Sequence, residues 1–306
     1  MKYKLVFLGI VVLLALILVG SYNFPSLNTV IIKYPSVEVS DINFSREDIQ
    51  KSLNEFLFNR ALNQNNFSKV TSNIVLAEVL DSNNIFLDRN TSKVVPIASL
   101  TKLMTAVVAL ENIKVDTKIT LSSQAINSFG DFGNFKIGET FLLKDLLDGM
   151  LISSSNDAAT AIAEQLGIRH FVALMNQKAQ QLGMTRTVFV DPTGLSLNDK
   201  STAYDLEKLV RYILDYHPEI FDVTKNYQIQ IKELNSGKMK LLSNDNRFSR
   251  DDNFLGGKTG FLLNLDKGGL ITIFHYKDYR ISIIVLNDDF YTRYTNIQQI
   301  LDNLPQ

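Results

Sequence analysis

Ser99 and Lys102 are the two residues whose types and spacing point most directly to chemistry. They stand in the stretch 96–110, where apolar residues follow on every side and predict a helix buried on all faces. Residues three apart on a helix share one face, so the Lys102 amine can reach the Ser99 hydroxyl. A buried lysine loses its charge more readily and can then activate a serine nucleophile. The pair alone also fits an ordinary helix start, with Ser99 as N-cap and Lys102 in solvent.

A serine run, Ser154-Ser155-Asn156, separates two helical patterns at 142–152 and 157–166. The spacing predicts a helix cap, with Ser154 as the N-cap and Asp157 three residues later. A capping role does not exclude a catalytic one, so both interpretations stay open.

A glycine-rich segment, 256–260, precedes a predicted strand and contains Lys258 and Thr259. Its glycines would let the backbone approach a ligand closely, and its side chains would present a cation and a hydroxyl to a carboxylate. The alternative is a glycine turn with a solvated lysine.

The order of predicted elements indicates an α+β fold, in which an antiparallel sheet is flanked by helices and joined to a mostly helical subdomain. A hairpin at 73–87 comes first, and a largely helical region follows. The predicted C-terminal elements are a hairpin at 227–242, strands at 260–264, 269–276 and 279–286, and a helix at 291–301. We expect the first and last strands to share one sheet.

The composition excludes several classes of function. The 306 residues are 45% hydrophobic, and 31 basic residues nearly balance 32 acidic ones. No basic run carries interleaved aromatic residues, so we expect no nucleic-acid partner. Cysteine is absent and the three histidines lie far apart, so we expect no disulfide and no metal site.

The N-terminus predicts a membrane segment. Lys2 and Lys4 precede an apolar run at 5–20, about the length needed to cross a bilayer, with positive charge on the inner side. We expect residues 1–22 to form an uncleaved anchor at the cell membrane, with the remainder exported. Cleavage as a signal segment is the alternative, and would release a secreted protein.

We expect residues 23–67 to form a stalk with a short amphipathic helix, and residues 68–306 to form the catalytic domain. The expected apolar face of that helix carries Ile49, Leu53, Phe56 and Leu57.

Together the three polar motifs resemble a known signature. Ser99-Leu-Thr-Lys102, Ser154-Ser-Asn156 and Lys258-Thr-Gly260 occur in the order typical of the penicillin-recognising serine enzymes. The segments 96–105, 149–159, 191–195 and 201–206 are similar to the low-molecular-mass D-alanyl-D-alanine carboxypeptidases. The resemblance covers about residues 70–301 and implies a β-lactamase and DD-peptidase type of fold.

This resemblance implies roles for the first two motifs. Ser99 would be the acylated nucleophile and Lys102 its general base. Ser154 would relay the proton to the leaving D-alanine, and Asn156 would hold the substrate amide and the Lys102 side chain.

The third motif, by the same resemblance, would bind substrate. Lys258 and Thr259, followed by Gly260, would hold the terminal carboxylate, and the N–H groups of Ser99 and Phe261 would form the oxyanion hole. Arg293 aligns only loosely, and we expect it to be a surface residue.

The implied function is a membrane-anchored carboxypeptidase that removes the terminal D-alanine from peptidoglycan stem peptides, binds β-lactams covalently and needs no cofactor. The alternatives are a D,D-endopeptidase or a β-lactamase using the same site, or a non-catalytic peptidoglycan-binding regulator. Ser155 stands where class A β-lactamases carry aspartate, and no Glu-x-x-Leu-Asn loop lies between Asn156 and Lys258. Efficient β-lactam hydrolysis is therefore disfavoured.

Overall fold

The computed structural model describes residues 46–127, 130 and 133–305. The chain divides into two compact units, residues 1–49 and residues 50–306. The architecture described below is that of the second unit. The predicted membrane segment at 1–22 lies outside the described residues, as does the predicted stalk up to residue 45. Within the described range, every helix is too short or too polar to span a bilayer.

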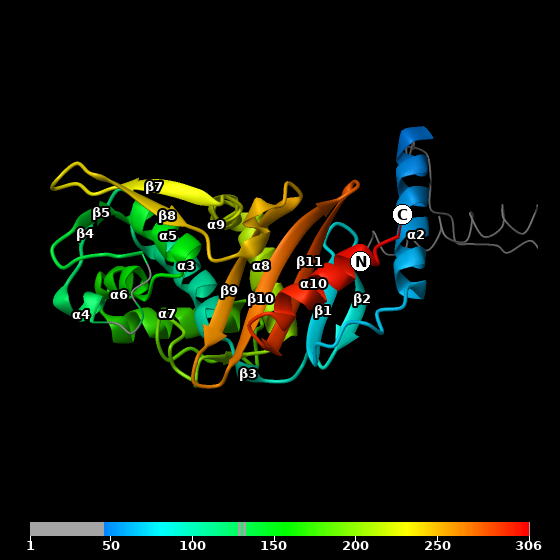
Figure 1. The fold of residues 1–306 in the computed structure, drawn as a ribbon, viewed down its shortest axis with the longest axis horizontal. Helices are drawn as coiled ribbons and strands as arrows, with labels where there is room; N and C mark the ends of the chain where they lie inside the picture. Colours follow the sequence, from blue (N-terminus) through cyan, green and yellow to red (C-terminus); the bar gives the residue numbers. More distant parts are fainter. Residues whose placement is uncertain (1–45, 128–129, 131–132, 306) are drawn as a thin grey trace, which may run out of the picture. The chain divides into compact units, whose positions relative to one another are not determined.

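A five-stranded antiparallel sheet organises this unit, with strand order β2-β1-β11-β10-β9 (Figure 1). The register of β1 against β11 runs from Ile74 opposite Leu286 to Val79 opposite Ile281. The prediction that the first and last strands share one sheet is therefore confirmed, as is the α+β class. The strands are β1 (Ile74–Val79), β2 (Asn84–Arg89), β9 (Phe254–Leu262), β10 (Lys267–Tyr276) and β11 (Tyr279–Asp288).

Side chains of the central strands alternate between two hydrophobic clusters, one on each face of the sheet. On β1, Ile74 and Leu76 join the larger cluster, which includes helix α8 (Ala203–Tyr216). Val75 and Val79 join the smaller cluster, which includes helix α10 (Thr292–Asp302). Because both faces are covered, every residue of β1 is buried.

The helical region extends from the larger cluster and is centred on α3 (Thr101–Asn112). All residues from Thr101 to Ala109 are buried, which confirms the predicted helix surrounded by apolar side chains. The other helices and small strands here are β4 (Lys118–Thr120), α4 (Ser123–Ile126), β5 (Thr140–Leu142), α5 (Leu143–Ser153), α6 (Asn156–Glu164), α7 (Ile168–Gln181), α9 (Glu219–Thr224), β7 (Gln228–Lys232), β8 (Met239–Ser243) and the 3₁₀ turn η2 (Arg247–Arg250).

Helix α2 (Arg46–Gln64) buries a different face from the one predicted. Leu62 is fully buried and Phe58 stacks on Tyr279 with ring centroids 4.4 Å apart, whereas Phe56 and Leu57 are exposed. The reason is tertiary, because the aromatic rings of the β10–β11 turn select the helix face that packs against them.

Strand β9 begins six residues before the predicted start at residue 260. The alternative of a glycine turn at 256–257 is wrong, because Gly257 pairs with Thr272 inside the sheet. A Cβ atom on Gly257 would lie 2.1 Å from the Ile271 carbonyl oxygen, so glycine there allows close strand packing.

A two-stranded pairing leads the chain into the Ser99 turn. Strand β3 (Val95–Pro96) pairs with β6 (Lys200–Ser201), and the Ile97 N–H donates to the Asp199 carbonyl at 3.0 Å. The 3₁₀ turn η1 (Ala98–Leu100) follows at once and runs into α3. The position of β6 therefore determines where the turn that carries Ser99 lies.

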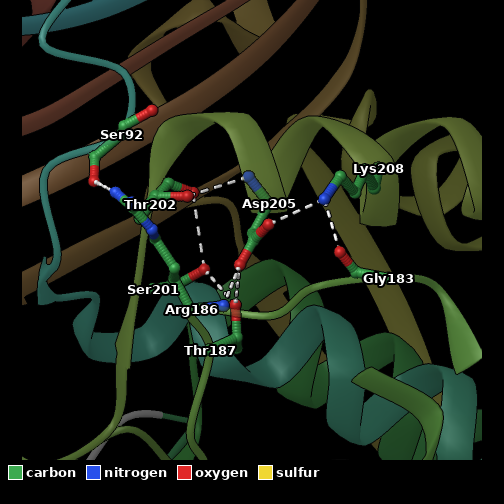
Figure 2. Close-up of polar contacts among 8 residues, drawn as sticks. All are labelled: Ser92, Gly183, Arg186, Thr187, Ser201, Thr202, Asp205 and Lys208. Carbon is green, nitrogen blue, oxygen red and sulfur yellow. Dashed lines mark hydrogen bonds and ion pairs between the residues drawn. The ribbon is translucent and has the colours of Figure 1, made fainter. Parts of the chain in front are cut away.

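Figure 2 shows the polar network that holds β6 in place, centred on Asp205 of α8. The Asp205 carboxylate accepts from the Arg186 N–H at 2.8 Å and from the Thr187 hydroxyl at 3.0 Å. Thr187 Oγ1 in turn lies 2.8 Å from Ser201 Oγ, on β6. The Thr202 hydroxyl accepts from the Asp205 N–H at 3.0 Å and caps α8.

The loop at 191–196 packs directly on the η1 turn through Gly194. Gly194 has a φ of +82°, and a Cβ atom there would lie 1.9 Å from the Ala98 carbonyl oxygen. Only glycine fits both the backbone conformation and the space.

We predict that Gly194→Ala lowers the free energy of unfolding by about 3 kcal/mol or more, because left-handed strain adds to a backbone clash. Gly183→Ala is the matched control, since Gly183 also has a positive φ of +69° but open space around its Cβ position. It should cost only about 1–2 kcal/mol. Urea unfolding of both variants measures the difference, and equal losses would contradict the proposed contact.

Candidate active site

The Lys102 amine is the centre of the site and is fully buried. Its Nζ atom lies 2.9 Å from Ser99 Oγ and donates to Asn156 Oδ1 and to the Thr193 carbonyl oxygen, each at 2.6 Å. An amide or carbonyl oxygen can only accept, so these two partners take two N–H groups. In a neutral amine the lone pair is then left for the Ser99 hydroxyl proton. The geometry suits a base that receives a proton from Ser99.

Electrostatics favour that neutral form. Burial lowers the pKa of Lys102 well below its ordinary value, and the positive charge of Lys258 lowers it further. The carboxylates of Asp191, Asp245 and Asp199 act in the opposite direction with smaller effects.

Ser99 lies half-buried in the η1 turn, at the N-terminal end of α3, where the first N–H groups have no acceptor within the helix. Strand β9 passes close to this turn at Gly260. A Cβ atom on Gly260 would lie 2.8 Å from the Ile97 carbonyl oxygen. Gly260 thus brings the next residue, Phe261, beside Ser99, as an oxyanion hole made by their N–H groups requires.

The second motif is divided between two helices. Ser154 ends α5 in a left-handed conformation with a φ of +58°, and the Ser155 hydroxyl caps α6 by accepting from the Ala158 N–H at 3.2 Å. The prediction of Ser154 as N-cap was therefore wrong by one residue. Because Ser155 takes the capping role, Ser154 is free to line the cavity and Asn156 opens α6 beside Lys102.

The third motif lies on β9, the outermost strand of the sheet. Lys258 is buried, and its Nζ donates to Ser154 Oγ at 2.8 Å and to the Thr259 carbonyl oxygen at 3.0 Å. Burial lowers the pKa of Lys258 to about 8, with Asp245 opposing this effect and Arg293 adding to it. The alternative of a solvated lysine on a glycine turn is wrong.

Arg293 is not a surface residue, contrary to expectation, because only 2% of it is exposed. Its Nη1 donates to the carbonyl oxygens of Gly260 at 2.7 Å and Gly269 at 3.1 Å, which fastens α10 to β9 and β10. Arg293 shares the buried face of α10 with Ile297 and Ile300, but its acceptors lie 33 and 24 residues away in the chain.

A cavity of about 590 Å³ lies above these groups. Among the predicted site residues, six line it directly, while Lys102 and Lys258 do not line it. The lining residues are Ser99, Ser154, Asn156, Gly194, Leu195, Asp245, Thr259, Gly260, Phe261, Leu262, Leu263, Asn264, Phe290 and Arg293. Within the described part of the chain, no cluster of side chains could hold a metal ion.

Sequence reasoning missed a pair of acidic residues that shapes the loop behind Lys102. One Asp191 oxygen accepts from the N–H groups of Thr193 at 2.6 Å and Gly194 at 2.7 Å. Asp199 accepts from the Val190 N–H at 2.7 Å, and burial together with Asp191 raises the pKa of Asp199 to about 8. The Asp-Pro-Thr-Gly turn signal could have located Asp191, and the pair fixes the Thr193 carbonyl that Lys102 uses.

The chain also matches known proteins. Residues 61–290 match the D-alanyl-D-alanine carboxypeptidase family. The D-alanyl-D-alanine endopeptidase of Pseudomonas aeruginosa is 41% identical over 140 residues, covering 44% of this chain and 45% of that protein. The D-alanyl-D-alanine carboxypeptidase DacF of Bacillus subtilis is 33% identical over 190 residues, covering 59% and 48%. The chain therefore spans about half the length of these relatives.

Solved structures share the fold. The Streptomyces K15 DD-transpeptidase superposes with a TM-score of 0.70 at 21% identity, over 76% of this chain and 97% of that one. Since the family match covers most of the chain and includes all three polar motifs, the resemblance found in the sequence is confirmed, and this protein belongs to the D-alanyl-D-alanine carboxypeptidase family.

Proposed function

We propose that the chain is a serine D-alanyl-D-alanine carboxypeptidase that acts on peptidoglycan stem peptides through an acyl-enzyme at Ser99. The observation that carries the proposal is the buried Lys102 amine, 2.9 Å from Ser99 Oγ, at the base of an open cavity. A buried base beside a half-exposed hydroxyl is the arrangement that nucleophilic catalysis requires.

In the acylation step, the Ser99 hydroxyl gives its proton to Lys102 as its oxygen bonds to the carbonyl carbon of the penultimate D-alanine. The N–H groups of Ser99 and Phe261 stabilise the developing oxyanion, and one such donor is typically worth about 3–4 kcal/mol. The peptide C–N bond then breaks, and the departing amine receives a proton through Ser154. Water later cleaves the acyl ester and restores the Ser99 hydroxyl.

In the proposed complex, the Lys258–Thr259 part of the cavity wall holds the substrate carboxylate. Lys258 supplies the positive charge, and the Thr259 hydroxyl supplies a donor on the cavity lining. Because Lys258 also donates to Ser154 Oγ at 2.8 Å, carboxylate binding is placed next to the proposed proton relay.

D,D-endopeptidase cleavage of cross-links is the second candidate. Three matched relatives, between 35% and 41% identical, are named D-alanyl-D-alanine endopeptidases, whereas the matched carboxypeptidases of Bacillus subtilis and Mycobacterium tuberculosis are 33% and 31% identical. Both reactions would use the same acyl-enzyme and differ only in the leaving group.

Membrane anchoring completes the proposal and rests on the apolar run at 5–20 alone. An anchored enzyme would hold its catalytic domain outside the cytoplasm, beside its substrate. Carbonate extraction of membranes from cells that produce the full chain distinguishes an uncleaved anchor from a cleaved segment.

We predict that benzylpenicillin forms one covalent adduct, with its β-lactam ring opened onto Ser99. Intact mass spectrometry should show one added antibiotic mass on the wild type and none on Ser99→Ala. Ser155→Ala is the matched control, because its hydroxyl caps α6 and should not be acylated. An adduct that survives in Ser99→Ala would refute the assignment of the nucleophile.

The rate of acylation should depend on pH as a bell-shaped curve. Lys102 must be neutral, so the rate rises with pH through the lowered pKa of that amine. Lys258 must be charged, so the rate falls as pH passes about 8. Lys258→Arg should keep its charge and move the alkaline limb upward by about one pH unit or more. Stopped-flow acylation across pH 5–10 tests this, and an unmoved alkaline limb would exclude Lys258 as its origin.

Product analysis should separate the two candidate reactions. We expect release of D-alanine from a pentapeptide monomer to exceed cleavage of a cross-linked muropeptide dimer by about tenfold in kcat/KM, a difference of about 1.4 kcal/mol in transition-state stabilisation. Chromatography of both digests measures the ratio. A reversed ratio would favour the endopeptidase, and rapid turnover of nitrocefin would favour a β-lactamase.

A further inference from the structure

Asp245 is a cavity-lining residue that the mechanism above does not use. Its backbone is held on two sides, since its N–H donates to the Ile152 carbonyl at 3.1 Å and its carbonyl accepts from the Tyr294 hydroxyl at 3.3 Å. The side chain therefore starts from a defined position between the end of α5 and helix α10.

The Asp245 carboxylate is available to a ligand. Within the described residues its side chain forms no hydrogen bond and no ion pair shorter than 4 Å, and the residue is exposed. Partial removal of the carboxylate from water raises the pKa of Asp245, and the positive charges of Lys258, Lys102 and Arg293 oppose this effect. Among the residues that line the cavity, it is the sole carboxylate.

The position of Asp245 corresponds to the leaving-group end of the cavity. Its N–H is bonded to Ile152, two residues before Ser154, and Ser154 accepts from Lys258. In the proposed reaction the substrate carbonyl sits at Phe261, so the acyl part continues toward Leu262, the last residue of β9. Leu262 follows Lys258 by four residues, about 13 Å in an extended strand, so the two ends are well separated.

We propose that Asp245 determines specificity by favouring substrates whose leaving residue carries a cationic side chain. This inference rests on the proposed function, because it presumes that Lys258 and Thr259 hold the carboxylate of the leaving residue. A leaving residue with a neutral side chain offers the Asp245 carboxylate no direct partner. One with a side-chain ammonium pairs its carboxylate with Lys258 and its ammonium with Asp245.

Two peptides that differ only in the leaving residue test this: diacetyl-L-Lys-D-Ala-D-Ala and diacetyl-L-Lys-D-Ala-D-Lys. At low ionic strength, wild-type kcat/KM should favour the D-Lys peptide by about three- to tenfold, the size expected for a partly solvated ion pair. Asp245→Asn should reduce the ratio to about one. Salt at about 0.5 M should also shrink the wild-type preference.

Asp252→Asn is the matched control, because Asp252 is exposed, carries the same charge and does not line the cavity. This variant should keep the wild-type ratio.

Two outcomes would overturn the inference. One is equal wild-type rates on the two peptides. The other is a ratio unchanged in Asp245→Asn, and if both rates then fall equally, the residue acts only through Lys258. If neither peptide is hydrolysed and no penicillin adduct forms on Ser99, the proposed function fails as well. If the adduct forms and the ratio is one, only the inference fails.

Discussion

The site depends on one interaction, the burial of the Lys102 amine among oxygen acceptors. Removing an ammonium from water is costly, so the fold must supply partners for the amine in either protonation state. Those partners come from separate parts of the chain: Ser99 lies one turn away, Asn156 opens α6, and Thr193 stands in the loop before β6. A displacement of any one of these segments leaves a buried polar group without its partner.

Close backbone contacts hold the segments that supply the partners of Lys102 in place. Gly194 brings the Thr193 loop against the Ser99 turn, and Gly260 brings β9 against the same turn from the other side. Behind these contacts, Asp205 fixes β6 through Thr187 and so fixes the strand that leads into Ser99. The catalytic geometry is therefore a product of backbone packing and of a polar network whose residues do not line the cavity.

A feature could be predicted from the sequence when it depends on residues that lie close together in the chain. The Ser99–Lys102 pair and the buried helix α3 depend on spacing within one turn, and both are found in the structure. The hydrogen-bond partners of Arg293 could not be predicted, because they belong to strands far away in the chain. Ser155 caps α6 in place of Ser154 because Ser154 ends the preceding helix in a left-handed conformation and α6 begins at Asn156. The distant convergence of motifs came from family resemblance, since spacing alone cannot bring Lys258 to Ser154.

In the proposed mechanism the two buried lysines, Lys102 and Lys258, hold opposite charge states, and their surroundings differ accordingly. Burial lowers the pKa of both amines, so burial alone cannot separate their roles. For Lys102 the next largest effect is the repulsion of Lys258, which favours the neutral base. For Lys258 the next largest effect is the attraction of Asp245, which favours the charged clamp. The charge on Lys258 thus supports the neutrality of Lys102, and Asp245 supports that charge, so a single carboxylate at the cavity wall connects substrate binding with activation of the nucleophile.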